Sequence, residues 1–474
     1  MSKINIDNDG GDTDDVKYDK EKETLEKLNK TRSRDYEEDY SDMDTGWAWV
    51  ILLSSFGTFC FLGCALYAVG IIHLTLIDRY QQSLSLTSWA GALHTALISL
   101  TGPLSSTISD RYSCRVAIVL AGVLYVFGYL GTALAPNIEV AIFTCGIISG
   151  LAGGIAFTAN TIVVGLNFKR RRNLALGIAM SGNGAGLFIF APFLQFLREE
   201  YDPVGFFIIL AGIFANMITF GVLCFPRKLE RKIMKQRSLN VNSVATKKSN
   251  SASCDCVTLK RYWTILSTKP ILLLCIASFN YCLAMNLLFI HFPKFIVHKG
   301  FSPAQAAFFI SFAGIFNIVG RIGAGAIANM ENVNVLLLYN TCMLVVVIIS
   351  IVYPFLAQYY YTHVIYYVLL GTFMGPPFSL VTSAVLHFVG VDSMAVAVGL
   401  VFGFGGIGAV IGPVSAGVLI DNGGTYEQSI IAAGSCSLLA AILGCTTMCM
   451  KQRNQTIEFT GNINEEQDKM INSL

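Results

Sequence analysis

Charged residues are scarce in this sequence. Asp, Glu, Lys and Arg make up 14% of its 474 residues, whereas a soluble domain carries roughly 25%. Hydrophobic residues make up 54% and fall into repeated long apolar runs. This pattern excludes a soluble enzyme with one large core and predicts an all-α polytopic membrane protein, with the lipid bilayer as its first partner.

Motifs for covalent or metal chemistry are also missing. The sequence shows no nucleophile–base pair, no cluster of metal ligands and no phosphate loop between a strand and a helix. The glycine-rich run around Gly405 lies inside an apolar segment, so we assign it to helix packing rather than to a nucleotide site. We therefore expect no catalytic residue, no metal, no cofactor and no nucleic-acid partner, and the protein is predicted not to be an enzyme.

Twelve apolar segments are long enough to cross a membrane as helices, which takes about 20 residues each. They cover residues 47–75, 87–108, 115–134, 138–166, 173–197, 204–225, 270–292, 304–328, 334–356, 360–389, 394–419 and 427–449. A long polar segment divides them six and six, which predicts two six-helix halves. The predicted regions are an acidic tail 1–45, a first half 46–226, a basic linker 227–269, a second half 270–450 and a tail 451–474.

The polar regions differ in charge. Residues 1–45 hold 15 of the 31 acidic residues against 8 basic ones and contain no apolar run, which predicts a disordered tail. Short basic loops follow the second span, at Arg111 and Arg115, and the fourth, at residues 169–172. By the positive-inside rule this side is predicted to be cytoplasmic, together with both termini and the linker.

The loop after the second span reads "GPLSSTISDRYSCR", residues 102–115. Together with the six-plus-six organisation, it resembles the major facilitator superfamily, whose two halves hold a substrate near the midplane. We expect Asp110 to form an ion-pair latch with Arg111 or Arg115 that differs between the inward and outward states. The alternative is that both arginines only anchor the topology.

Two further stretches carry a closer resemblance. Residues 44–50 read "DTGWAWV", and residues 167–186 read "NFKRRRNLALGIAMSGNGAG". They resemble the two signature motifs of the monocarboxylate transporter family, so the resemblance assigns functional motif roles to Asp44, Gly46, Trp47, Trp49, Arg170 and Arg171. A structural reading is also open for these residues: tryptophans mark the membrane interface, and basic clusters fix topology.

An arginine stands inside the eighth span, in "AGIFNIVGRIGAG" at residues 313–325. Burying Arg321 costs at least ~2.5 to 3.5 kcal/mol, and spans seven to twelve offer no acid inside the membrane. The resemblance implies that Arg321 faces the central cavity and pairs with a substrate carboxylate, for which a guanidinium fork is well suited. The alternative is a structural arginine that binds backbone carbonyls.

Three positions depart from the proton-coupled members of the family. Asn317 stands where they carry an aspartate one turn before the arginine, and an amide cannot take up and release a proton near neutral pH. Tyr67 stands where they carry a lysine in the first span, and His387 stands where relatives often carry an acid in the tenth span. With His291, which matches a landmark at the outer end of the seventh span, Asn317 and Tyr67 are expected to shape the substrate site around Arg321.

The expected function is facilitative transport of a monocarboxylate or another carboxylate-bearing solute, such as an aromatic amino acid or a creatine-like molecule. The resemblance implies the plasma membrane. Some relatives require a single-span accessory glycoprotein for surface delivery, and the sequence leaves open whether this protein needs such a partner. One alternative is a proton-coupled symporter of lactate or pyruvate. Its proton site would be one of five histidines: His73, His94, His291, His363 or His387. A second alternative is a non-transporting membrane sensor.

Overall fold

A computed structural model describes residues 43–67, 69–82, 84–234, 253–421, 423–425 and 427–448. Within these ranges the regular elements are all helical. The predicted disordered tails, apart from residues 43–45, lie outside the described residues. The fold-class prediction of an all-α protein is therefore confirmed for the part of the chain that the structure covers.

The first half contains the spans before the linker. Its helices are α2 (Trp47–Tyr67), α3 (Val69–Tyr80), α4 (Leu84–Leu100), α5 (Gly102–Arg111), α6 (Cys114–Leu134), α7 (Ile138–Ala141), the π-helical η1 (Ile142–Ile148), α8 (Ser149–Asn167), α9 (Arg172–Glu200) and α10 (Pro203–Leu223). The predicted second span is divided into α4 and α5 at Thr101, where Pro103 stands in the first turn of the new helix. Proline suits a first turn because it lacks the N–H that has no helical partner there.

The second half follows the linker helix α12 (Ser253–Leu266). Its helices are α13 (Lys269–His298), α14 (Pro303–Ile327), α15 (Val335–Leu356), α16 (Tyr360–Met374), α17 (Pro376–Asp421) and a last helix Glu427–Met448. The tenth span is interrupted between Met374 and Pro376, as the Pro376–Pro377 pair predicts. Helix α17 contains two spans, because Gly390 takes a non-helical conformation with φ +68° between them.

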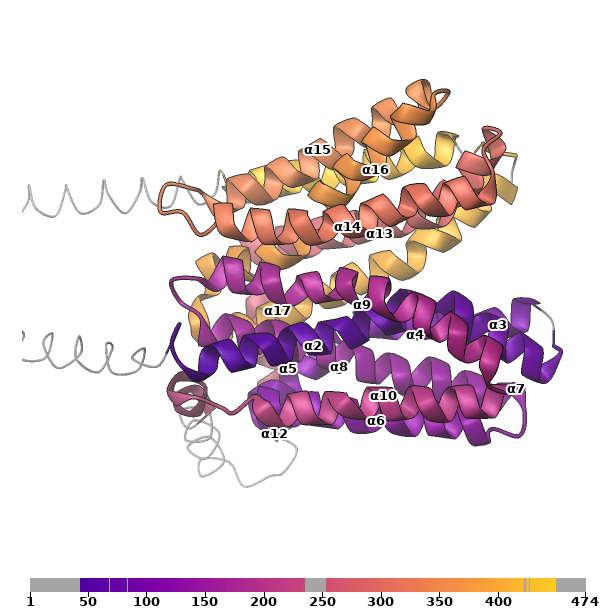
Figure 1. The fold of residues 1–474 in the computed structure, drawn as a ribbon. Coiled ribbons are helices and arrows are strands. Elements are labelled where there is room, and N and C mark those ends of the chain that lie inside the picture. The colour runs from indigo at the N-terminus through magenta and orange to yellow at the C-terminus, as the bar shows by residue number, and fades with distance from the viewer. Residues whose placement is uncertain are drawn as a thin grey trace, which may run out of the picture.

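Ten helices of the described chain are long and apolar enough to cross a membrane. The shorter apolar helices Trp89–Leu100 and Phe312–Ile327 supply the second and eighth spans. Figure 1 shows the helices side by side, with α12 and the start of α2 at one end of the molecule and α3 and α7 at the other. We call the first of these the basic end; it carries the loops around residues 111–115 and 168–172 and is the side predicted to be cytoplasmic.

The two halves meet along two seams, each built by glycines. In the first, the α9–α14 seam, Gly177 lies against the backbone carbonyl of Arg321. In the second, the α5–α17 seam, Gly102 lies against the backbone of Gly399, and Gly406 lies against that of Ser99 on α4. Glycine is needed at these points because a Cβ atom would overlap with the opposing backbone. Both seams therefore hold the halves in backbone-to-backbone contact.

Candidate functional site

The candidate site is a buried pair of polar side chains on α14. Asn317 and Arg321 stand four residues apart, which places them on one helical face. The Arg321 Nε donates a hydrogen bond to Asn317 Oδ1 over 2.8 Å. The Asn317 amide in turn donates to the Gly371 carbonyl of α16 over 3.5 Å. Arg321 is only 7% exposed and Asn317 only 8%, so the sequence's isolated cation is held by a neutral amide.

Aromatic residues from two other helices surround this pair. The Arg321 guanidinium carbon lies 5.7 Å from the ring centroid of Phe378 at the start of α17, within range of a cation–π interaction. The ring of Tyr281 on α13 lies 5.6 Å from that of Phe378. The buried Tyr281 hydroxyl donates to the Met374 carbonyl over 2.7 Å. The site thus has one charged group, one amide and two aromatic rings.

Gly375 makes room for the pair between α16 and α17. A Cβ at this position would lie 2.5 Å from Asn317 Nδ2 and 2.8 Å from Arg321 Nε, which is closer than real Cβ atoms come. Sequence analysis did not identify Gly375, Phe378 or Tyr281. Two features of the sequence could have indicated them: the Gly-Pro-Pro break in the tenth span, and a tyrosine inside the otherwise apolar seventh span.

The geometry allows Arg321 to bind an anion. A guanidinium carries five N–H donors in a fixed fork, and the contact with Asn317 uses the single donor on Nε. The two Nη groups carry the other four donors, and parallel N–H bonds from such a fork match the two oxygens of a carboxylate. Asn317 and Phe378 fix the orientation of the guanidinium plane, which reduces the conformational entropy lost on binding.

Tyr67 and His291, the other two predicted substrate residues, belong to helices of the two halves. Tyr67 is the last residue of α2, and His291 lies in α13. Their side chains lie outside the described part of the structure, so their contribution to the site stays a prediction.

The two family-like stretches meet at the basic end. The Asp44 carboxylate accepts hydrogen bonds from the backbone N–H groups of Lys169, Arg170 and Arg171 over 2.8–3.0 Å. These amides immediately precede α9, whose N-cap is Arg171, and a negative charge is favoured at this end of a helix. Asp44 has φ +56° and Gly46 has φ +51°, so the chain turns sharply to bring the carboxylate onto the loop. Asp44 therefore holds the loop that leads into α9, a helix of the α9–α14 seam.

The tryptophans of the first stretch extend this contact. The Trp47 indole N–H donates to the Leu223 carbonyl at the end of α10 over 2.9 Å. The Trp49 ring packs edge-on against Phe168, and the Arg171 guanidinium lies 5.8 Å from its centroid. Trp47 and Trp49 thus join α2 to the loops at the ends of α8 and α10.

Asp110 has a charged partner that the sequence did not indicate. Its Oδ2 lies 3.0 Å from Nη1 of Arg261, which belongs to α12 of the linker. Arg111 and Arg115 each lie over a neighbouring aromatic ring. The structure therefore brings the predicted latch residues to the basic end and adds the linker helix to them; whether they switch between states stays a prediction.

A tyrosine of α12 strengthens the same contact. The Tyr262 hydroxyl lies 2.6 Å from Ser106 Oγ and 2.9 Å from Thr107 Oγ1 on α5. It also donates to the Pro103 carbonyl over 2.8 Å. The linker was predicted to be polar and basic, and its last described part forms helix α12, which packs on the α5–α17 seam.

The candidate proton-site histidines lie in several different places. His73 and His94 line one small cavity in the first half. His363 is fully buried in the second half, where its Nδ1 lies 2.7 Å from the Tyr353 hydroxyl. His387 is exposed. Among the described residues no group of three or more His, Cys, Asp or Glu side chains could hold a metal ion.

Comparisons with known proteins agree with this architecture. Residues 51–413 match the family model of the Major Facilitator Superfamily. The chain is 25% identical to monocarboxylate transporter 12 of Homo sapiens, over 92% of this chain and 86% of the relative. It is 26% identical to monocarboxylate transporter 9 of Mus musculus, over 86% and 95% of the two chains.

Solved structures share the fold at lower sequence identity. The human organic anion transporter MFSD10 (TETRAN) is 14% identical with a TM-score of 0.66, over 84% of this chain and all of the other. The proton:xylose symporter XylE is also 14% identical, with a TM-score of 0.63, over 84% and 94%. The chain is therefore a membrane solute transporter that belongs to the Major Facilitator Superfamily, and it is similar to the monocarboxylate transporters.

Proposed function

We propose that this protein carries a carboxylate-bearing small solute by alternating access, and that it does so without proton coupling. The buried Asn317–Arg321 pair supports this proposal most directly. A cation inside a membrane protein normally marks a substrate or ion pathway. The α14 arginine lies where the halves meet, since Gly177 of the opposite half packs on its backbone carbonyl.

The chemistry of the pair favours an anionic group on the solute. Arg321 supplies a permanent positive charge, and Asn317 fixes its orientation by a neutral hydrogen bond. Because an amide does not titrate, binding and release of the solute at this pair require no proton. Relatives named monocarboxylate transporters support the same solute class. A facilitative carrier follows from this combination.

The aromatic walls point to a solute with a flat or ring-bearing body. Phe378 and Tyr281 present rings beside the guanidinium, and rings pack well on planar groups. Aromatic amino acids and creatine-like molecules combine such a body with a carboxylate. We place the carrier in the plasma membrane with its basic end toward the cytoplasm, and a single-span accessory glycoprotein is a proposed partner in its delivery.

Uptake into proteoliposomes tests the proposal. The panel is labelled lactate, pyruvate, an aromatic amino acid and creatine, each with and without a pH gradient. Arg321→Ala should reduce uptake of the accepted solute by at least ~30-fold, because removing a buried charged partner costs about 2 kcal/mol or more. Arg321→Lys should restore only part of it, since an ammonium lacks the planar fork.

The control is Arg198→Ala, which removes a partly exposed arginine paired with Asp78 at the other end of the molecule. It should transport at nearly the wild-type rate. If Arg321→Ala, present in equal amount, matches the wild type, the site assignment is wrong. Uphill uptake driven by the pH gradient alone would identify a proton symporter, and binding without any transport would identify a sensor.

A further inference from the structure

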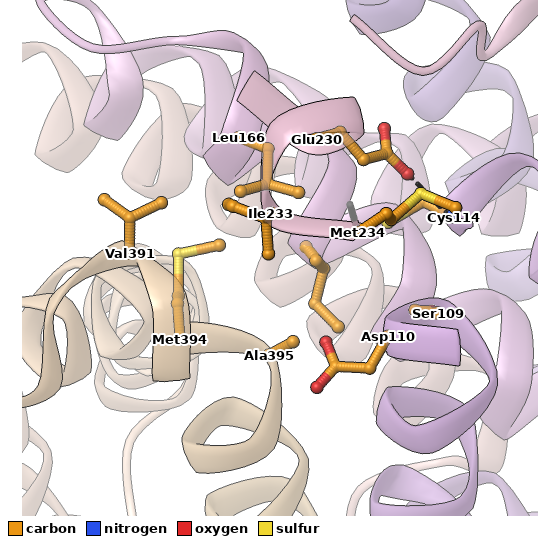
Figure 2. Close-up of a pocket in the computed structure, with 11 residues that line it drawn as sticks. Ser109, Asp110, Cys114, Leu166, Glu230, Ile233, Met234, Val391, Met394 and Ala395 are labelled. Atoms are coloured by element: carbon orange, nitrogen blue, oxygen red, sulfur yellow. Dashed lines mark hydrogen bonds between the residues drawn. The ribbon is translucent and has the colours of Figure 1, made fainter. Parts of the chain in front are cut away.

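A second polar site lies at the basic end, away from Arg321. It is a small cavity of about 20 Å³, enough for about one water molecule. Figure 2 shows the residues that line it, which come from three parts of the chain. The first half, the helical segment 228–234 and α17 all contribute to its lining. The lining residues are Ser109, Asp110, Cys114, Ile162, Leu166, Glu230, Ile233, Met234, Val391, Met394 and Ala395.

Glu230 is the notable member of this lining. It is only 4% exposed, although it lies just beyond the sixth span. Its Oε1 accepts a hydrogen bond from the backbone N–H of Cys114 over 2.9 Å, at the first turn of α6. Its Oε2 is buried and has no hydrogen-bond partner within the described part of the chain. A half-satisfied buried carboxylate is costly when ionised and much less so when protonated.

The segment that carries Glu230 touches both halves. Leu229 and Ile233 form a small apolar cluster with Met43, against which Leu166 of α8 and Val391 of α17 pack. Met394 and Ala395 of α17 close the cavity from the same side. Alternating access requires the two halves to separate at this end. Separation would withdraw Val391 and Met394 and admit water to Glu230.

We propose that Glu230 is a proton-binding site that links pH at the basic end to the opening of that end. With its proton, the carboxyl group is accommodated in the closed cavity. Without it, the carboxylate favours the open state, in which water hydrates Oε2. This device is independent of the solute carried and of the Asn317–Arg321 pair.

The surroundings of Glu230 favour its protonated form in the closed cavity. Burial raises the pKa of Glu230 above its ordinary value of 4.5, while hydrogen bonds from Cys114 and the charge of Arg231 act in the opposite direction. Asp110 faces the same cavity and is paired with Arg261. Helix α17 contributes only the uncharged side chains of residues 391, 394 and 395 to the lining.

The direction of the pH effect follows from linkage. The closed state, with the raised pKa, binds the proton more tightly than the open state, so protons stabilise closure. This stabilisation is complete below the open-state pKa, near 4.5, and is lost as pH rises through the closed-state pKa. A lower pH at the basic end should therefore favour the state in which this end is closed, and a higher pH should favour the state in which it is open.

Hydrogen–deuterium exchange of the full-length protein in liposomes, without solute, tests this device. After correction for intrinsic exchange, amides of residues 228–234 and 391–396 should be more protected at about pH 5 than at about pH 8, because protons stabilise the closed state. Glu230→Gln should be protected at both pH values. An exposed acid of the same end, mutated as Glu331→Gln, should leave the pH response intact.

Two results would overturn the proposal: a wild-type protein whose corrected protection does not change with pH, or a Glu230→Gln variant that keeps the full response. If Glu230→Gln fails to fold, Glu230→Asp serves instead. It keeps a titrating carboxyl but shortens its reach to Cys114, so the midpoint of the response should shift. An unchanged midpoint would exclude Glu230 as the proton site. Because no solute is present, these results do not depend on the proposed transport function.

Discussion

The two seams between the halves are built alike but carry different chemistry. Both use glycines to bring backbones together, Gly177 in the α9–α14 seam and Gly102 in the α5–α17 seam. The α9–α14 seam holds a buried charge, Arg321, and a hydrogen bond from the Asn173 side chain to the Ala328 carbonyl crosses it. The α5–α17 seam is instead covered by the linker helix α12.

This difference suggests a division of labour between the seams. Around the α5–α17 seam, Arg261 pairs with Asp110, and Tyr262 reaches three oxygens of α5. Such contacts stabilise one arrangement of the halves and involve no solute. The α9–α14 seam instead has a buried charged group, Arg321, at its centre, which suits a surface that must open around a solute. Variants of the two seams should therefore change different measured quantities.

After the loss predicted for Arg321→Ala, the largest effect on uptake is expected at Gly375, which lies directly against the Asn317–Arg321 pair. Gly375→Ala places a Cβ 2.5 Å from Asn317 Nδ2 and 2.8 Å from Arg321 Nε, so the pair has to move. Misplacing a binding group by about 1 Å can cost ~10²-fold, and we expect uptake to fall by at least about tenfold. Radiolabelled uptake normalised to the amount of protein in the membrane measures this loss.

The matched control is Gly323→Ala on α14 itself, where an added Cβ meets no atom within 4 Å. Its uptake should stay close to that of the wild type. Equal losses in both variants would indicate a general sensitivity of the helices, and the special role given to the α9–α14 seam would then be wrong.

A second prediction sharpens the chemistry of that seam. Asn317→Asp puts a carboxylate at the position whose oxygen lies 2.8 Å from Arg321 Nε. The new acid should pair with the arginine and compete with the solute carboxylate. We expect uptake near pH 7.5 to fall about tenfold and to recover as the acid is protonated at lower pH. The pH dependence of initial uptake, compared with Asn317→Ala, measures this.

In the wild type, uptake should not recover at low pH through the Asn317–Arg321 pair, because the Asn317 amide does not titrate. If Asn317→Ala shows the same acid-stimulated uptake as Asn317→Asp, the response does not come from the introduced carboxyl group. The pair would then not control coupling, and the contrast between the seams would lose its chemical basis.

Much of the membrane-embedded architecture could be predicted from the sequence. Apolar length and the basic loops are local properties, so twelve spans could be predicted, and the twelve-helix fold is confirmed. The contact between Asn317 and Arg321 also follows from local geometry, because side chains four residues apart share a helical face. A charge inside an apolar run is visible without any structure.

Contacts between distant segments could not be predicted in this way. Arg261 meets Asp110 across 151 residues of sequence, and nothing in a Ser- and Asn-rich linker indicates which loop it will contact. Glu230 likewise looks like one charge among many in a basic segment. Its burial depends on α6, α8 and α17 meeting around it. The sequence indicates that Gly375 ends a helix. Its second role, leaving room for Asn317 and Arg321, depends on side chains of another helix.

The smallest effect is expected at the cover of the α5–α17 seam. Tyr262→Phe removes the hydroxyl that contacts Ser106, Thr107 and the Pro103 carbonyl. Ser106 and Thr107 each keep a hydrogen bond to that carbonyl. The free energy of unfolding should therefore fall by about 1 kcal/mol. The melting temperature should fall by about 1–3 °C, while the KM for the solute stays within about twofold.

Thermal unfolding of the purified variant and its uptake kinetics give these two quantities together. Tyr112→Phe, at an exposed tyrosine of the same end, should change neither. A Tyr262→Phe variant with normal thermal stability but a KM changed well beyond twofold would contradict the division of labour. Solute recognition would then extend to the seam that α12 covers, and the two seams would differ in their cross-links but not in their function.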